Sequence, residues 1–127
     1  MAIEITETLA GPVTVLALKG RITLGEGTQE FRNRITLALD DAKWRKERWG
    51  WNLCLILDMA QLEFMDSAGL GVLVGVYASA QHQNAAIKLA NLTKMLQDLL
   101  IITKLSTVFE VYSSVEEAKA SCPKPAP

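Results

Sequence analysis

An uninterrupted apolar run from Leu53 to Leu57 is the feature that most constrains the fold of this chain. Near-continuous aliphatic residues are typical of a strand that is covered on both faces of its sheet. The run ends at Asp58, and apolar residues recur with helical spacing after Ser67, at positions 70, 73, 74, 77 and 78. We therefore predict a buried strand that ends near Asp58, a connecting loop, and a helix that begins at Asp66 or Ser67.

The rest of the chain alternates between segments with strand-like and helix-like patterns. Apolar and polar residues alternate where strands are predicted, whereas predicted helices place apolar residues three and four apart. The other strands are predicted over residues 3–8 and 13–19, from residue 86, and over 108–112. The other helices are predicted to begin at Thr28 and Ser114, which suit an N-cap, and near Thr93.

This order, ββαβαβαβα, predicts a single α/β domain over residues 1–121. Parallel strands need crossover connections, so we expect a mostly parallel mixed sheet with an N-terminal antiparallel strand and four helices. Binding sites of such sheets lie beyond the carboxyl ends of the strands. The segments 20–27, 58–67 and 91–93 leave those ends and are expected to share one rim. The Pro-rich residues 122–127 are predicted to form a disordered tail.

Two predicted helices have apolar faces that we expect to be buried. The face of the first helix is formed by Phe31, Ile35, Ala38, Leu39 and Ala42. The face of the helix after Ser67 is formed by Leu70, Leu73, Val74 and Tyr77. Gly71 and Gly75 share one side of that second helix, where missing side chains permit close approach by the sheet or by a partner.

Composition excludes several classes of function. The chain has 127 residues and a net charge of −1, so neither nucleic acid nor a membrane surface is expected as a partner. No apolar stretch reaches the roughly 20 residues that span a bilayer, and the N-terminus does not resemble a signal peptide. Cys54 and Cys122 form no Cys-x-x-Cys pair, so we predict neither a disulfide nor a zinc site. The expected location of the chain is the reducing cytoplasm.

Ser67 allows two interpretations from its local chemistry. Serine and aspartate are common N-caps, whose oxygens accept bonds from the unpaired N–H groups of the first helical turn. Alternatively, Ser67 presents an exposed hydroxyl for phosphorylation, because a helix N-terminus accommodates an added phosphate well.

The segment Phe64-Met65-Asp66-Ser67-Ala68-Gly69-Leu70-Gly71 resembles the signature loop of the STAS domain family, whose small bacterial members are anti-sigma-factor antagonists. Residues 18–22, 86–92 and 105–111 resemble further strands of that family, so the similarity extends over roughly 3–120. The resemblance implies that Ser67 is phosphorylated by a partner anti-sigma factor that is itself a serine protein kinase. The unphosphorylated chain would bind this anti-sigma factor and thereby free a sigma factor. The phosphorylated chain would dissociate from the anti-sigma factor.

The resemblance, together with the predicted rim, also implies which residues contact the partner. These are Thr23, Asp58, Asp66, Ser67, Ala68, Gly69 and Asn91. Thr23 is a departure, because many antagonists carry aspartate there. It is consistent instead with scaffold-type family members, in which threonines are also modified.

No catalytic pattern is found, so we predict a substrate of an enzyme rather than an enzyme. His82 is the only histidine, the Gly-x-Ser-x-Gly elbow of hydrolases is absent, and no cofactor or metal site is expected. Two alternatives stay open: a STAS scaffold or transport-associated subunit that phosphorylation does not switch, and a nucleotide- or small-molecule-binding module at the same rim. A weak homodimer also stays open.

Three tryptophans, Trp44, Trp49 and Trp51, occur among charged residues in what we predict to be a long connection before the buried strand. One interpretation is that Trp51 and Trp44 pack against the edge of the core while the charges are solvated. The other is a patch that faces a partner, since tryptophan and arginine are favoured interface anchors.

Overall fold

The computed structural model describes residues 3–50 and 52–122, and its elements follow the predicted order. The strands are β1 (Ile3–Ala10), β2 (Val13–Ile22), β3 (Cys54–Met65), β4 (Ala86–Ala90) and β5 (Glu110–Tyr112). The helices are α1 (Glu26–Trp49), α2 (Ser67–His82), α3 (Lys94–Ile102) and α4 (Val115–Ser121). The strands form one five-stranded sheet in the order β1-β2-β3-β4-β5. Only β1 pairs antiparallel with its neighbour, which confirms the predicted α/β class.

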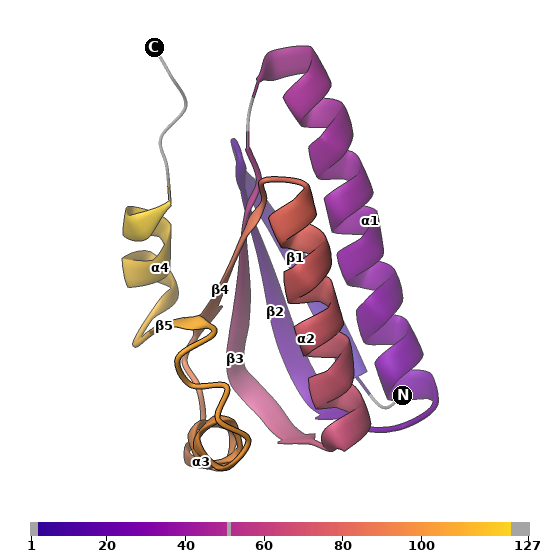
Figure 1. The fold of residues 1–127 in the computed structure, drawn as a ribbon, viewed down its shortest axis with the longest axis vertical. Helices are drawn as coiled ribbons and strands as arrows, with labels where there is room; N and C mark the ends of the chain where they lie inside the picture. Colours follow the sequence, from indigo (N-terminus) through magenta and orange to yellow (C-terminus); the bar gives the residue numbers. More distant parts are fainter. Residues whose placement is uncertain (1–2, 51, 123–127) are drawn as a thin grey trace.

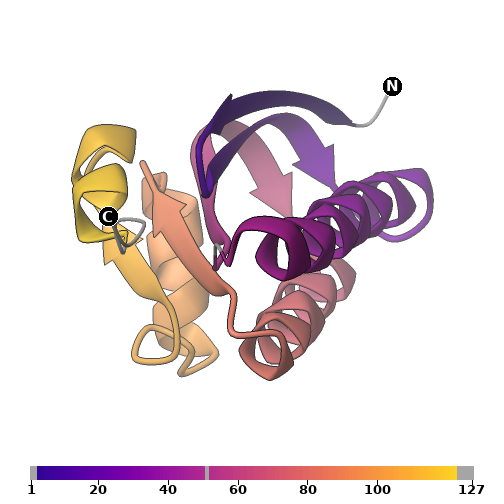
Figure 2. The same ribbon diagram turned by 90° about the horizontal axis from the view of Figure 1, so that it is seen from above.

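The helices are distributed unequally over the two faces of the sheet (Figure 1). Helices α1 and α2 lie side by side on one face, which we call the front face, and α3 lies at the end of the sheet reached by β3. Helix α4 lies on the opposite, back face, beside β4 and β5 (Figure 2). The two faces therefore carry hydrophobic clusters of different sizes.

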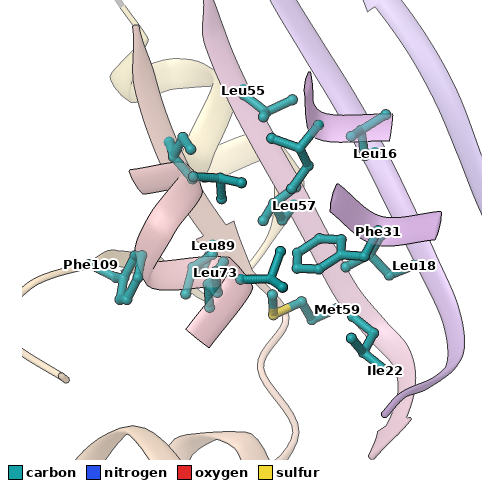
Figure 3. Packing of buried hydrophobic residues seen from close by; sticks show 14 of the residues in the cluster. Leu16, Leu18, Ile22, Phe31, Leu55, Leu57, Met59, Leu73, Leu89 and Phe109 are labelled. Carbon is teal, nitrogen blue, oxygen red and sulfur yellow. The ribbon is translucent and has the colours of Figure 1, made fainter. Parts of the chain in front are cut away.

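The main core fills the space between the front face and helices α1 and α2 (Figure 3). Alternate residues of β2 and β3 point into it, as the two-residue period of a strand requires. The predicted inner face of α1 is confirmed, since all five of its residues are buried. Each fully buried leucine of such a core contributes roughly 1.5–3 kcal/mol. The fully buried leucines at its centre are Leu16, Leu18, Leu55, Leu57, Leu62, Leu73 and Leu89.

Strand β3 is longer than predicted, because it continues past Asp58 to Met65. Strand β2 also continues, to Ile22, and supplies the hydrogen-bonding partner for this extension. Between the pairs Ala17–Asp58 and Ile22–Met65, β3 carries two more residues than β2, one at each of two register shifts. These bulges break the strict alternation of buried and exposed residues. For this reason the sequence pattern after Asp58 predicts a loop where the structure has the second half of β3.

Helix α1 also continues further than predicted and includes the segment that we expected to be a connection. Its last residue is Trp49, and its C-cap is Gly50, which has a left-handed backbone (φ 72°) and whose N–H donates to the Lys46 carbonyl at 2.8 Å. Trp44 and Trp49 meet edge to face at 5.2 Å, with the Arg48 guanidinium above both rings. Trp44 is 52% exposed, so the interpretation in which it packs against the edge of the core is wrong. Trp51 lies outside the described residues.

Cys54 and Cys122 form a disulfide, so the prediction against one is wrong. The two residues are 68 positions apart, and only the return of α4 over β3 brings their Cα atoms to 5.9 Å. A search for local Cys-x-x-Cys pairs cannot detect such a contact. Cys122 is buried and therefore belongs to the domain, whereas the rest of the predicted tail lies outside the described residues.

Candidate functional site

Asp66, one of the two residues predicted to cap α2, is its N-cap. Its extended backbone (φ −92°, ψ −176°) lets Oδ1 accept a hydrogen bond from the Gly69 N–H at 2.9 Å. This bond satisfies one of the donors that the first turn of a helix leaves unpaired. Because β3 ends at Met65, the strand leads into the helix through Asp66 alone.

The second carboxylate oxygen of Asp66 reaches a different part of the chain. Oδ2 accepts a hydrogen bond from the Leu24 N–H at 2.9 Å, and the Asp66 N–H donates to the Ile22 carbonyl at 3.1 Å. Asp66 therefore ties the loop between β2 and α1 to the start of α2. The bonds from the backbone N–H groups of Gly69 and Leu24 hold the pKa of Asp66 below its usual value. The carboxylate is charged at neutral pH and both of its oxygens are engaged.

Ser67 is the first helical residue of α2 and is exposed to solvent. One and two turns further, Gly71 and Gly75 share its outward side of the helix and are also exposed. A Cβ atom added at either glycine would meet nothing within 4 Å. The sheet does not approach these glycines, so that part of the prediction is wrong, whereas approach by a partner stays a prediction.

The inward side of α2 differs partly from the predicted one. Leu70 and Leu73 are buried as predicted, but Val74 is 37% exposed and Tyr77 is half-buried. The buried residues of α2 are Gly69, Leu70, Val72, Leu73, Val76 and Ala80. The prediction failed because α2 is apolar on nearly all sides, so its periodicity does not identify the face that packs.

Gly69 allows the start of α2 to approach the strand ends closely. A Cβ atom at this position would lie 2.8 Å from Ile22 Cγ2, from the Ile22 carbonyl oxygen and from Met65 Cγ. Only glycine fits without displacement of the backbone. The close approach places Ser67 beside the loop that follows Ile22.

That loop contains one predicted contact residue, Thr23, and one residue that sequence reasoning missed, Leu24. Thr23 is half-buried, and its carbonyl accepts a hydrogen bond from the Thr28 N–H at 3.1 Å. Thr28 is not the predicted cap, because α1 begins earlier, with Gly25 as its N-cap. Leu24 is 81% exposed next to Asp66. Its sequence signal is an aliphatic residue placed between Thr23 and Gly25, just before the start of α1.

Asp58 and Asn91 lie together, but away from Ser67. Asn91 Nδ2 donates to Asp58 Oδ1 at 3.0 Å. Asp58 is paired with Ala17 and Ala90, whereas β3 continues to Met65 before Ser67 follows. The predicted single rim is therefore divided. Thr23 and residues 66–69 are gathered at one place, and Asp58 and Asn91 at another.

An apolar groove, also missed by sequence reasoning, lies next to the Ser67 site. It runs between the end of β3 and α3, and its lining residues are Phe64, Met65, Lys94, Met95, Asp98, Leu99 and Ile102. Two of them, Lys94 and Asp98, form an ion pair at 2.8 Å. Among residues 3–50 and 52–122, no group of three or more His, Cys, Asp or Glu side chains is placed to hold a metal ion. None of the helices described is long and apolar enough to cross a membrane.

The family model of the STAS domain matches residues 4–118. The chain belongs to the STAS domain family. The anti-sigma-B factor antagonist of Listeria monocytogenes is 36% identical over 59 residues, which cover 46% of this chain and 52% of the relative. The match thus spans about half the length of that curated relative.

Solved structures with low sequence identity share the whole fold of this STAS domain. An anti-sigma factor antagonist from Mycobacterium paratuberculosis superimposes with a TM-score of 0.77 at 18% identity, over 94% of this chain and 92% of that one. The phosphorylated form of the Bacillus cell fate determinant SpoIIAA gives a TM-score of 0.67 at 19% identity, over 94% and 97%. At such identities the likeness shows the fold alone.

Proposed function

We propose that this STAS domain is an anti-sigma-factor antagonist whose binding to its partner is controlled by phosphorylation of Ser67. The observation that carries the proposal is the position of Ser67, exposed at the first residue of α2 on a side that the rest of the described chain leaves open. The names of its relatives support the partner class, since they are anti-sigma factor antagonists.

Phosphorylation at this position would change the surface and leave the fold in place. A phosphoserine adds about −1.5 to −2 charge, one residue away from the charged Asp66. The backbone N–H groups and dipole of the helix N-terminus tolerate such an anion, so α2 would stay intact. A partner that packs on Ser67 and the neighbouring Leu24 would meet unfavourable charge and lose affinity through repulsion and desolvation.

The proposed contact residues have different roles. Thr23, Leu24, Ser67 and Ala68 form the proposed contact surface with the partner, and Asp66 presents the Leu24 loop through its bond to the Leu24 N–H. Gly69 is buried, so its proposed role is to position Ser67 rather than to touch the partner.

Asp58 and Asn91 occupy the separate cluster described above, bonded to each other. Their proposed contribution is a second contact with the same partner. A partner that reaches both clusters would have to extend along β3.

The proposed partner is an anti-sigma factor with serine protein kinase activity. This chain would then be the substrate of a phosphoryl transfer and would perform no catalysis of its own. A cycle that controls sigma factors would place the protein in the cytoplasm.

The test starts from the partner. The unmodified chain is used as bait in its native lysate, and an ATP-binding anti-sigma factor is expected among the captured proteins. Calorimetry then compares the phosphorylated and unphosphorylated chain with that purified factor. We expect phosphorylation to weaken binding at least about tenfold, or 1.4 kcal/mol. Equal affinities would refute the switch and favour a STAS scaffold that phosphorylation does not control.

Two substitutions separate the hydroxyl from the charge. Ser67→Ala should retain partner binding but take up no phosphate from the kinase. Ser67→Asp should weaken binding while leaving Tm nearly unchanged, because a carboxylate at a helix N-terminus is neutral or favourable. Ser79→Asp adds the same charge at an exposed serine near the other end of α2 and should leave binding unchanged.

A further inference from the structure

The back face of the sheet carries its own small hydrophobic cluster, separate from the main core. Its buried members are Val15, Cys54, Ile56, Ala90, Ala118 and Cys122. Figure 1 shows α4 alone on this side, apart from α1 and α2. We call these six residues the back-face cluster. Helix α4 covers it and supplies Ala118, while Cys122 follows as the C-cap of the helix.

Besides the disulfide, α4 is held by the partly buried Val115, which packs against the back-face cluster, and by exposed hydrogen bonds at its first turn, including one from Ser113 Oγ to Glu117 Oε2 at 2.7 Å. The helix has seven residues, which is too short to be stable by itself in water. Its N-terminus is capped by Ser114, whose Oγ accepts a bond from the Glu117 N–H at 3.1 Å, but this bond is exposed. Of its own residues only Ala118 is fully buried. The covalent bond from Cys122 to Cys54 in β3 is therefore the strongest constraint on the C-terminal end of α4.

We propose that the Cys54–Cys122 disulfide is a reversible redox switch that determines whether α4 covers the back face of the sheet. A thiolate of a dithiol reductant, such as a cellular dithiol protein, attacks the sulfur of Cys122, because Cys122 is the more exposed residue of the pair, at 8% against 1% for Cys54. The Cys54 thiolate leaves and takes up a proton. The second thiol of the reductant then resolves the mixed disulfide, so that two electrons and two protons pass to the protein and the reductant becomes a disulfide.

Reduction is expected to release α4 without unfolding the domain. The main core, between the front face and helices α1 and α2, contains neither cysteine and no residue of α4. Strand β5 keeps its own pairing with β4, from Lys88–Glu110 to Ala90–Tyr112. It also keeps the ion pair between Lys88 Nζ and Glu110 Oε1 at 3.0 Å. The released segment would thus begin after Tyr112.

The cellular compartment is a further reason to expect that the Cys54–Cys122 bond opens and closes. This reason rests on the proposed function. Sigma-factor control would place the chain in a reducing cytoplasm, where disulfides are rare and, when present, are usually transient or redox-sensing. A disulfide and a cytoplasmic role are compatible if the bond opens and closes. The test below requires no partner, so its failure would leave the proposed function untouched.

The experiment is hydrogen exchange on the full chain, incubated either with oxidised glutathione or with dithiothreitol. Thiol counts under denaturing conditions should show no free cysteine in the first buffer and two in the second. The amides of residues 118–122 should exchange at least about tenfold faster after reduction, because they then open without the covalent constraint. Amides of α2 should exchange equally in both buffers. Returning the reduced chain to oxidised glutathione should restore the slow exchange.

Cys122→Ser is the matched control and should show fast exchange of α4 in both buffers. Three results would overturn the proposal. Free thiols that persist in oxidised glutathione would mean that no bond forms. Equal protection of α4 in both states would mean that packing alone holds the helix. Loss of protection in α2 on reduction would mean that the bond supports the whole fold instead of one helix.

Discussion

The two sides of α2 carry different properties although both are rich in apolar or small residues. The inward side packs Leu70, Leu73 and Val76 against the sheet and α1, whereas the outward side exposes Ser67 and Gly71. The inward side therefore contributes to stability, and the outward side is available for a partner. Substitutions on the two sides should consequently have separate effects, on unfolding in one case and on binding in the other.

Two glycines of the signature segment, only two residues apart, show the same contrast between the inward and outward sides of α2. Gly69 faces Ile22 and Met65 with no room for a methyl group, while Gly71 faces open space. The family motif thus contains one glycine that the fold requires and one that the fold does not explain.

The largest expected effect is on the inward side, at Leu73, which is 1% exposed in the main core. Figure 3 shows its side chain among the buried residues of this core, which include Leu57 and Phe31. Leu73→Ala should lower the free energy of unfolding by roughly 2–5 kcal/mol, because it removes buried methyl groups and leaves a cavity. Val74→Ala, one residue further on the exposed side, should change it by less than about 0.5 kcal/mol. Urea denaturation checks both, and equal losses would mean that the two sides are not distinct.

Gly69→Ala should have the next largest effect. The added Cβ would meet the Ile22 carbonyl at 2.8 Å, and this is backbone that cannot turn aside. We expect a loss of about 1–3 kcal/mol in the free energy of unfolding, as for other overpacked sites. A variant as stable as the wild type would show that α2 does not approach Ile22 so closely.

Gly71→Ala should have a smaller effect of opposite sign. Nothing within 4 Å obstructs the new methyl group, and alanine favours a helix by up to about 1 kcal/mol over glycine. The free energy of unfolding should rise by about 0.5–1 kcal/mol in the same denaturation assay. Destabilisation would contradict the open outward side.

The smallest expected effect on stability is at Asp66, the N-cap of α2. Its lowered pKa means that the charged carboxylate stabilises the folded state above the unfolded pKa of about 4. That contribution is lost as the pH falls through the folded pKa. Asp66→Asn keeps one oxygen to cap the Gly69 N–H but removes the charge and turns an NH2 group toward the Leu24 N–H, so the wild type should have the higher Tm at neutral pH. Thermal melts should show this advantage shrinking below about pH 4, and an advantage that grows in acid would refute the assignment.

Local signals predicted much of the site. The start of α2 was predicted at Asp66 or Ser67, and Asp66 is its N-cap; the cap of α4 at Ser114, outside the site, was predicted in the same way, because capping depends on residues within one helical turn. The exposure of Leu24 and the pairing of Asp58 with Asn91 were not predicted. Both depend on where β2, β3 and β4 end relative to one another, and no local pattern records this.

By itself, the sequence determined the order of the elements, the inner face of α1 and the position of Ser67 at a helix start, because periodicity and capping act over a few neighbouring residues. Tertiary structure decided the rest. β3 continues past Asp58 because β2 runs beside it, and α2 packs on one of several apolar sides because Gly69 fits against Ile22. Cys54 meets Cys122 because α4 folds back over the sheet. Each of these depends on contacts between residues far apart in the chain.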